Sequence, residues 1–459
     1  MLLNQIRITS LNVFMILLLL PMVTHAQEVD GFSYEPADIS SLPEFLDIIT
    51  QKKIVQYQGN FKKETVEFWE ERRSDVLENI EDSLYIFDPG VELGLKKILT
   101  NIYTANPEVN PLDFRFFIDA SPIPNASCYG NGIFVINNGL FSIIDNDDEL
   151  AFIICHEIAH YQLKHNDLSI EEYYQKYKSD NTNKRVNDIA KNKYGKFNKA
   201  RKLLEDINYD LGQKSRKAEI EADSLGLQLF LKTNYNPSAA GSILQKLDFE
   251  EKAMLNKPIA IKAYLGTVNY PFKDNWLKAG NNKLFDLDAS ANDYKMDADS
   301  IKTHPDIPKR IELINKSLPN ATDEIGMLVA NDLKKKSNLN NLQITLDNYR
   351  LDLSLYFIIT LYEEQKINEA EFYQLTALWL KKLYILKKSH AVGRFIPPES
   401  PFSNETEINK VKQFIQNLEP KNIRKLGYWL CNENVGHFST EAKQIELYSF
   451  FKKLNPSNK

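Results

Sequence analysis

Cysteine is scarce in this chain. Only Cys128, Cys155 and Cys431 occur among its 459 residues. An exported protein held together by a disulfide framework would carry more cysteines, and an even number of them. At most one bridge can form here, so we expect the three thiols to be small buried side chains.

Long apolar runs are also missing beyond the N-terminus. A membrane-spanning helix needs about 18 or more consecutive apolar residues, and the best later candidate, Leu355 to Tyr362, is far shorter. The formal net charge of -6 gives no electrostatic reason to expect a nucleic-acid partner. We therefore expect a mature chain with no transmembrane span, with peripheral membrane contact at most, and with no bound nucleic acid.

The N-terminal segment, residues 1–26, has the layout of a secretory signal peptide. Arg7 is its one charged residue, Val13 to Leu20 is wholly apolar, and Thr24 to Ala26 offers a small-residue cleavage site. This arrangement predicts cleavage after residue 26 and export, so that the mature protein is periplasmic or secreted. The alternative is an uncleaved membrane anchor, because neighbouring residues could lengthen the apolar core.

Three further regions follow the signal peptide. Helical spacing of apolar residues predicts a helical N-terminal region over 27–88. A break at Asp88-Pro89-Gly90 opens a central domain over 89–318, in which Leu112 to Asp119 and Ile133 to Ile136 are predicted strands. Residues 319–459 are again mostly helical. The predicted fold class is therefore α+β, mostly α, with helical N- and C-terminal extensions.

The central domain contains the sequence His156-Glu157-Ile158-Ala159-His160. On a helix, residues i and i+4 share one face about 6 Å apart, so both imidazoles can bind one tetrahedral zinc ion. Glu157 lies beside the first ligand, where it can act as general base toward a water on the zinc. The apolar run from Leu150 to Cys155 indicates a buried helix. It therefore favours a metal site over a surface helix with two ordinary histidines.

A zinc site needs a third protein ligand, and a second predicted helix, about Lys217 to Leu231, offers one. Glu219 and Asp223 are again i and i+4, and the small residues Ala222 and Gly226 lie on nearly the same side. We predict that Glu219 completes the zinc shell and that Asp223 orients an imidazole. A solvated acidic face is the alternative interpretation of this segment, and Glu221 is predicted to point elsewhere.

One of the remaining histidines is a candidate for a role in catalysis, and the others are not predicted to bind metal. His304, restrained by Pro305, could donate a hydrogen bond to an oxyanion or occupy the open metal position. A loop histidine without function is the alternative. His165 lies just past the motif and is predicted to be a helix-surface residue, and His390 and His437 have no companions at ligand spacing.

Together these segments resemble the family-48 zinc metallopeptidases, the group that includes the CAAX prenyl proteases, HtpX and the periplasmic BepA-like enzymes. The resemblance covers residues from about 90 to about 315, around half of the chain. The matching segments are Asn137-Asn138-Gly139-Leu140, Asp148-Glu149-Leu150-Ala151, His156 to His160, Ser215-Arg216, Glu219 to Asp223 with Gly226, and His304-Pro305 through Arg310.

The resemblance implies a gluzincin-type core, in which a small sheet lies beside two zinc-binding helices. It implies one zinc ion per chain at His156, His160 and Glu219, and base catalysis by Glu157. Arg216 and Arg310 stand at positions that the family keeps basic, which fits a structural or electrostatic role. In such folds the strand that borders the cleft pairs with extended substrate, and the residues expected here are Ile133, Phe134, Val135 and Ile136.

The family's membrane-embedded members carry spans around the active site, and this chain has none, so the resemblance favours the soluble, exported branch. We therefore predict a zinc-dependent endopeptidase that hydrolyses exported, unfolded or misassembled polypeptides. A chaperone-like or scaffold protein with a structural or latent zinc site is the alternative. In the latent form, His304 would cap the metal until a partner displaces it. Partners of the C-terminal helical region are not predicted.

Overall fold

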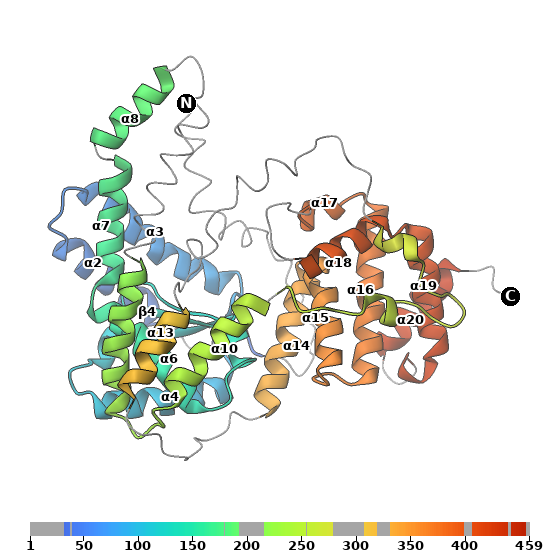
Figure 1. The fold of residues 1–459 in the computed structure, drawn as a ribbon, viewed down its shortest axis with the longest axis horizontal. Helices are drawn as coiled ribbons and strands as arrows, with labels where there is room; N and C mark the ends of the chain where they lie inside the picture. The colour runs from blue at the N-terminus through green and yellow to red at the C-terminus, as the bar shows by residue number, and fades with distance from the viewer. Residues whose placement is uncertain are drawn as a thin grey trace.

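A computed structural model describes residues 32–36, 39–178, 180–191, 215–253, 255–278, 307–318, 331–398, 406–438 and 442–455. These residues form two lobes that lie side by side in Figure 1. The sheet lobe comprises the described residues up to 253 together with 307–318, and the helical lobe comprises 255–278 and 331–455. The predicted signal peptide and His304 lie outside the described residues.

The sheet lobe is built around a four-stranded mixed sheet. Its strands lie in the order β1-β2-β4-β3, and their bounds are β1 (Tyr85–Ile86), β2 (Arg115–Asp119), β3 (Ala126–Cys128) and β4 (Ile133–Asn137). β2 and β4 run parallel, whereas the β1–β2 and β3–β4 pairs are antiparallel. β4 is therefore paired along both edges, and β3 forms one end of the sheet.

One face of the sheet is covered by the N-terminal helices. α2 (Leu42–Gln56) and α3 (Lys62–Glu81) form a hairpin whose buried side chains pack on Phe117, Ile133 and Val135. Alternate residues of a strand point to opposite faces, so Phe134 and Ile136 belong to the cluster on the other side of the sheet. The N-terminal helices thus share a core with the sheet.

The opposite face of the sheet is covered by the helices that frame the candidate site. α4 (Pro89–Ala105) and α6 (Asp147–Gln162) supply much of this cluster. The N-terminus of α6 is capped by Asn146, whose side chain accepts a hydrogen bond from the backbone N–H of Glu149 at 2.9 Å. Three acidic residues in the first turn also stabilise the helix, because they lie at the positive end of its dipole.

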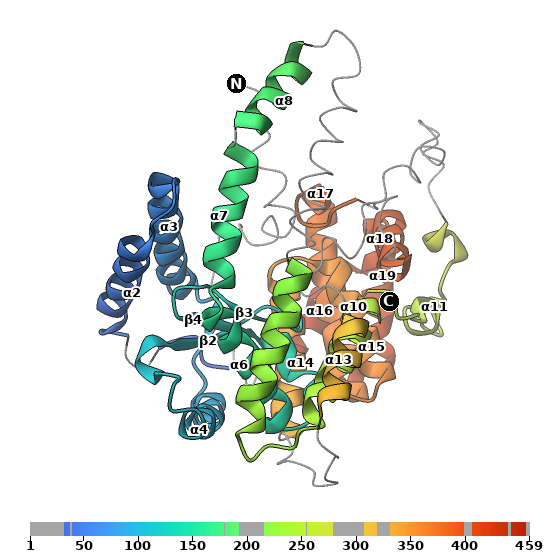
Figure 2. The same ribbon diagram turned by 60° about the vertical axis from the view of Figure 1, so that its left-hand side comes forward.

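Several shorter helices complete the sheet lobe. α7 (His165–Lys178) and α8 (Asp180–Lys191) extend well beyond the sheet in Figure 2. The remaining elements are η1 (Pro111–Asp113), α5 (Asn138–Phe141), a helix over 215–231, α10 (Ala239–Ala253) and α13 (Ile307–Ser317).

The helical lobe has its own apolar core. Within it, α15 (Leu351–Glu363) and α16 (Glu369–Lys388) pack against each other as a helical hairpin. Trp276 is buried in this core, so residues 255–278 pack here although the predicted boundary at 318 places them with the sheet. The elements are α11 (Ile261–Tyr264), η2 (Asp274–Leu277), α14 (Asn331–Asp347), α15 (Leu351–Glu363), α16 (Glu369–Lys388), α17 (Val392–Phe395), α18 (Thr406–Asn417), α19 (Pro420–Glu433), η5 (Val435–Phe438) and α20 (Ala442–Leu454).

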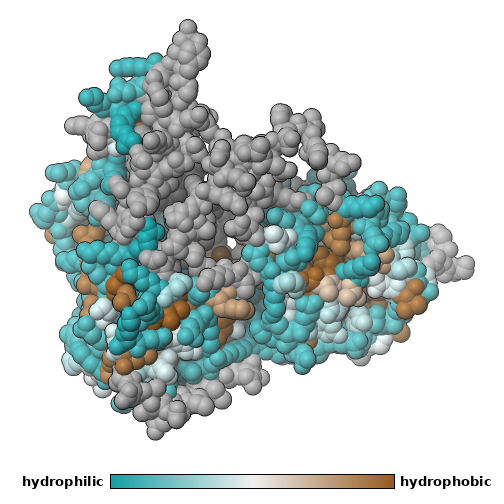
Figure 3. Space-filling model, viewed as in Figure 1, coloured by the Kyte–Doolittle hydropathy of each residue, from teal (hydrophilic) through white to brown (hydrophobic). Residues whose placement is uncertain are grey.

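Polar contacts join the two lobes at α14. The side-chain amide of Asn138 donates to the Asn341 side chain at 2.6 Å, and the Ser337 hydroxyl donates to the Asn138 carbonyl at 2.7 Å. The face seen in Figure 3 is mostly hydrophilic, with apolar residues on both lobes. Within the described part of the chain, no helix is both long enough and apolar enough to cross a membrane.

Candidate active site

Two helices of the sheet lobe meet at a glycine. A Cβ atom on Gly226 would lie 2.8 Å from the Cα and 3.0 Å from the backbone N of His156, which is closer than real Cβ atoms approach. The helix over 215–231 can therefore lie against α6 only because residue 226 has no side chain. Ala222 is also fully buried. These two small residues therefore permit the close approach of the two helices.

This approach brings three ligand-type atoms together. Nε2 of His156 and Nε2 of His160 are 3.0 Å apart, and the Glu219 carboxylate oxygens lie 3.5 Å and 3.3 Å from those two nitrogens. Ligand atoms at about 2.0–2.1 Å from a tetrahedral zinc ion are about 3.3–3.4 Å from one another. Among the described residues, His156, His160 and Glu219 form the one group of this kind that could hold a metal ion.

The His156 ring is held from behind by Asp223. Nδ1 of His156 lies 2.9 Å from Oδ1 of Asp223, which leaves Nε2 to face Glu219 and His160. Burial alone would lower the pKa of His156, but Asp223 and Glu219 outweigh it and raise the pKa to about 10. The site therefore has a strongly negative potential that attracts a cation.

Arg310 of α13 holds both carboxylates of the second helix. Its Nε and Nη2 donate to the two Asp223 oxygens at 2.6 Å and 2.8 Å, and its Nη1 lies 2.7 Å from Oε2 of Glu219. Burial opposes ionisation of Asp223, but Arg310 and His156 outweigh it and lower the Asp223 pKa. Arg310 therefore favours the charged form of Asp223 and holds both carboxylates in a fixed direction.

His165 is not the surface residue that its sequence position predicts. Its side chain is buried, with Nδ1 3.0 Å from Nδ1 of His160 and Nε2 3.3 Å from a Glu221 oxygen. That prediction is wrong because α6 ends before His165. Lys164 adopts φ +58°, and the chain turns so that α7 begins with the His165 ring facing back to His160. Burial and the charge of His160 lower the His165 pKa.

The donor set fits a divalent metal ion. With both Nδ1 atoms facing other partners, the lone pairs of two Nε2 atoms and a carboxylate oxygen converge on one point. Such a cluster of electron-rich atoms is repulsive unless a cation lies between them. Two imidazoles and one carboxylate are a ligand set typical of catalytic zinc, which keeps its fourth position open.

Comparisons with known proteins agree with this geometry. The sequence profile described as peptidase family M48 matches residues 95–318. Residues 95–318 therefore form a peptidase family M48 domain. A curated relative, the beta-barrel assembly-enhancing protease of Yersinia pestis, is 24% identical over 205 residues. That alignment covers 43% of this chain and 40% of the relative, so the chain spans less than half the length of the protein it matches.

Glu157 of this metallopeptidase is buried on α6 directly after His156. Burial raises the pKa of the Cys128 thiol on β3, and the charge of Glu157 raises it further. Burial would lower the pKa of Arg310, but the Glu219, Asp223 and Glu157 carboxylates raise it. Glu157 thus acts electrostatically on both β3 and Arg310.

The prediction that Ile133, Phe134, Val135 and Ile136 pair with substrate is wrong. These residues form β4, whose backbone is bonded to β2 on one side and β3 on the other. All four side chains are also buried. The strand at the end of the sheet is instead β3, which is three residues long.

The two remaining site predictions have different outcomes. Arg216 is half-buried one turn before Glu219 on the same helix, and Arg310 forms ion pairs with both Glu219 and Asp223. His304 lies outside the described residues, so its role stays a prediction. His165 and β3 are the functional candidates that the sequence did not indicate.

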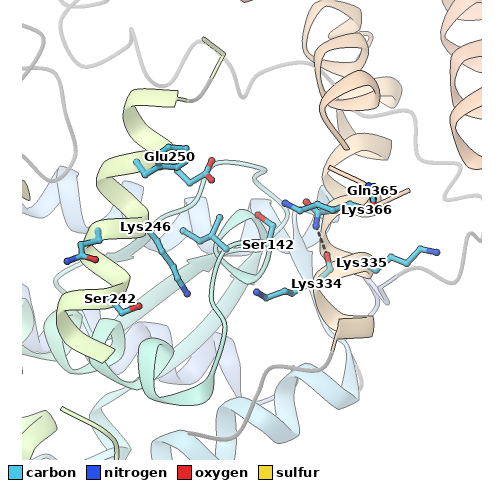
Figure 4. A pocket seen from close by; sticks show the side chains of 12 residues that line it. Ser142, Ser242, Lys246, Glu250, Lys334, Lys335, Gln365 and Lys366 are labelled. Carbon is cyan, nitrogen blue, oxygen red and sulfur yellow. Dashed lines mark hydrogen bonds between the residues drawn. The ribbon is translucent and has the colours of Figure 1, made fainter. Parts of the chain in front are cut away.

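A cavity of about 740 Å³ lies between the two lobes, away from the metal ligands. Figure 4 shows Lys246 of α10 on one side of it, and Lys334, Lys335 and Lys366 on the other. Each of these amines is paired with a carboxylate, and the partners are Glu149, Asp145, Glu371 and Glu364 respectively. The cavity is therefore an ion-paired junction rather than part of the catalytic centre.

Proposed function

We propose that this M48 metallopeptidase is a zinc-dependent endopeptidase that cleaves extended segments of exported, unfolded or misassembled polypeptides. It would hold one zinc ion per chain at His156, His160 and Glu219. The observation that carries the proposal is the convergence of these three side chains, with buried Glu157 beside them. A purely structural zinc site would not need a carboxylate in that position.

In the proposed reaction, a bound zinc ion would polarise the scissile carbonyl and make an attacking water more acidic. Glu157 takes the proton from that water and then delivers it to the leaving amine. Asp223 and Arg310 hold His156 and Glu219 in position. We assign His304 to the oxyanion or to a cap on the metal, the two roles that its sequence context predicts.

We place the substrate along the free edge of β3. Asn125, Ser127 and Tyr129 are the residues opposite Asn137, Val135 and Ile133, so their backbone groups point toward β4. The N–H and C=O groups of Ala126 and Cys128 therefore point outward. Asn166 already donates to the Cys128 carbonyl at 2.9 Å. Among the described residues no partner is recorded for the Ala126 backbone groups or the Cys128 N–H, and we propose that these groups pair with an extended peptide.

Two observations support exported polypeptides as substrates. Residues 1–26 have the pattern of a secretory signal peptide. The Yersinia pestis relative is described as a beta-barrel assembly-enhancing protease. The substrate class proposed here is broader than that name, because the similarity covers less than half of either chain.

The activity is tested with Glu157→Gln, which keeps the size of the side chain and removes its basicity. The wild-type protein should cleave casein in a zinc-dependent manner. The variant should be slower by about 100-fold or more while binding zinc equally well. The matched control is Glu92→Gln, at an exposed position of α4. Equal casein cleavage by wild type and Glu157→Gln would contradict the proposal and favour the chaperone-like alternative.

The substrate class is tested by proteomics of the exported fraction from cells that carry wild type or Glu157→Gln. Exported polypeptides should accumulate in the variant cells, and their cleavage products should be found in wild-type cells alone. Identical exported proteomes, together with casein cleavage in vitro, would refute the substrate class while leaving the peptidase assignment intact.

A further inference from the structure

We infer that His165 is a positioning residue for the metal ligand His160: its Nδ1 accepts a hydrogen bond from Nδ1–H of His160, and its Nε2–H donates one to Glu221. The inference rests on the proposed metal site. It assigns a role to a residue that lies outside the His156–His160 motif and that the reaction scheme above does not use.

The backbone delivers His165 to this place by a break between two helices. α6 ends at Gln162, and Lys164 takes a left-handed conformation with φ +58°. An L-residue adopts this region rarely and at some cost in free energy. The turn makes His165 the first residue of α7, with its ring centroid 4.9 Å from that of His160 and the two planes at 75°.

The two Nδ1 atoms are 3.0 Å apart, which is hydrogen-bond distance and requires one proton between them. A neutral imidazole carries its proton on one nitrogen and a lone pair on the other. For Nε2 of His160 to bind a metal, the shared proton must belong to Nδ1 of His160. Nδ1 of His165 is then the acceptor, so the proton of the His165 ring is on Nε2.

Glu221 sets this direction. Its Oε2 lies 3.3 Å from Nε2 of His165, and an ionised carboxylate can only accept a hydrogen bond. The reverse arrangement would put a proton on Nε2 of His160, pointing at Nε2 of His156 and at Glu219. Glu221 thus favours the tautomer of His165 that in turn leaves His160 able to bind metal.

The two ligand histidines are therefore supported in different ways. His156 faces the Asp223 carboxylate directly, and Arg310 offsets the charge of that carboxylate. His160 faces a neutral ring whose carboxylate, Glu221, is 45% exposed and also paired with Lys217. An imidazole in this position orients His160 without adding another buried negative charge to those of Glu157, Glu219 and Asp223.

The test compares zinc affinities measured by chelator competition on the full mature chain. His165→Leu removes the acceptor and should raise the zinc Kd by about 10- to 100-fold. His165→Asn places an amide oxygen near the position of Nδ1 and should recover most of the affinity. His437→Leu, a histidine substitution in the helical lobe, is the matched control and should leave the Kd unchanged.

Two readouts separate positioning from a merely structural role. The absorption spectrum of the cobalt-substituted protein should change in His165→Leu and be restored in His165→Asn. In 15N-histidine-labelled wild type with bound zinc, NMR should show scalar coupling between the two Nδ1 atoms across the hydrogen bond. This second measurement needs no variant, so it decides the matter even if His165→Leu does not fold.

The outcomes also separate this inference from the proposed function. Wild type that binds no zinc would refute the proposed metal site itself. Wild type that binds zinc, with His165→Leu binding it equally well, would overturn the inference alone. NMR evidence for a proton on Nδ1 of His165 in the zinc-bound protein would do the same.

Discussion

The two lobes treat ionisable side chains differently. In the sheet lobe, two histidines and three carboxylates from α6 and the helix over 215–231 are gathered around one point with Arg310. In the helical lobe, buried charged residues such as Asp352 and Glu407 each lie beside a local basic partner. The remaining buried polar side chains of this lobe are mostly uncharged, such as Ser354, Thr376 and Asn422.

This difference separates packing from function. Buried charges lose hydration, and several in one place are tolerated only when each is paired. The helical lobe follows the ordinary rule that apolar side chains fill the interior. In the sheet lobe, the buried charges are stabilised by many mutual contacts, and the same contacts hold the metal ligands in place. Substitutions in the two lobes should therefore have effects of different kinds.

The largest expected effect is that of Arg310→Met. It would leave the buried carboxylates of Glu219 and Asp223 without their cation, and breaking such a pair costs about 3–5 kcal/mol. Urea unfolding of the metal-free protein measures the loss. The counterpart in the helical lobe is Arg350→Met, where a half-buried arginine pairs with Asp352 alone. Equal losses in the two variants would contradict the proposed contrast between the lobes.

The next effect in size concerns two glycines. Gly226→Ala would press a Cβ against the backbone of His156, and overpacking of this kind costs about 1–3 kcal/mol. Because Glu219 is on the displaced helix, zinc affinity should fall together with stability. Chelator competition and urea unfolding measure the two quantities.

Gly427→Ala is the matched control for Gly226→Ala. Its Cβ would meet the ring of buried Phe451 in the helical lobe, 2.3 Å from Cε1. It should lower stability while leaving zinc affinity unchanged. Tryptophan fluorescence reports this loss, because Trp276, Trp379 and Trp429 are in the helical lobe and Trp69 alone is in the sheet lobe. A zinc affinity lowered equally by both substitutions would refute the separation of the lobes.

Local patterns explain how much of the site could be predicted from the sequence. The spacing of His156 and His160, the cap at Asn146 and the small residue Gly226 follow from the geometry of single helices and of one helix contact. Pairing Glu219 with the histidines needed one further assumption, that both helices face each other. The structure brings these side chains together.

The sequence failed where the chain departs from regular structure. On a continuous helix His165 would be rotated about 140° from His160, which predicts a different face. The left-handed Lys164 removes that continuity, and no glycine marks it. Likewise, the three residues of β3 follow two prolines and read as loop. Which strand is at the sheet edge depends on the parallel β2–β4 pairing, which no local pattern encodes.

The smallest expected effect is a pH dependence from Asp119, at the end of β2 in the sheet lobe. Burial raises its pKa to about 6, although a hydrogen bond from the Ser121 N–H at 2.7 Å acts in the opposite direction. In the unfolded chain an aspartate titrates near about 3.9. Between about pH 4 and about pH 6 the unfolded state has released this proton while the folded state still holds it. The free energy of unfolding therefore falls as pH rises through this range, and it stays lower at higher pH.

Asp119→Asn tests this effect because asparagine keeps the oxygen that accepts from Ser121 but does not titrate. The variant should match wild type near pH 4 and exceed it by about 1–2 kcal/mol at pH 7.5. Urea unfolding of both proteins at the two pH values measures the difference, in which the titration of all other groups cancels. The same difference at both pH values would show that Asp119 is charged at no cost. The metal centre would then be the main place in the sheet lobe where buried charge lowers the free energy of unfolding.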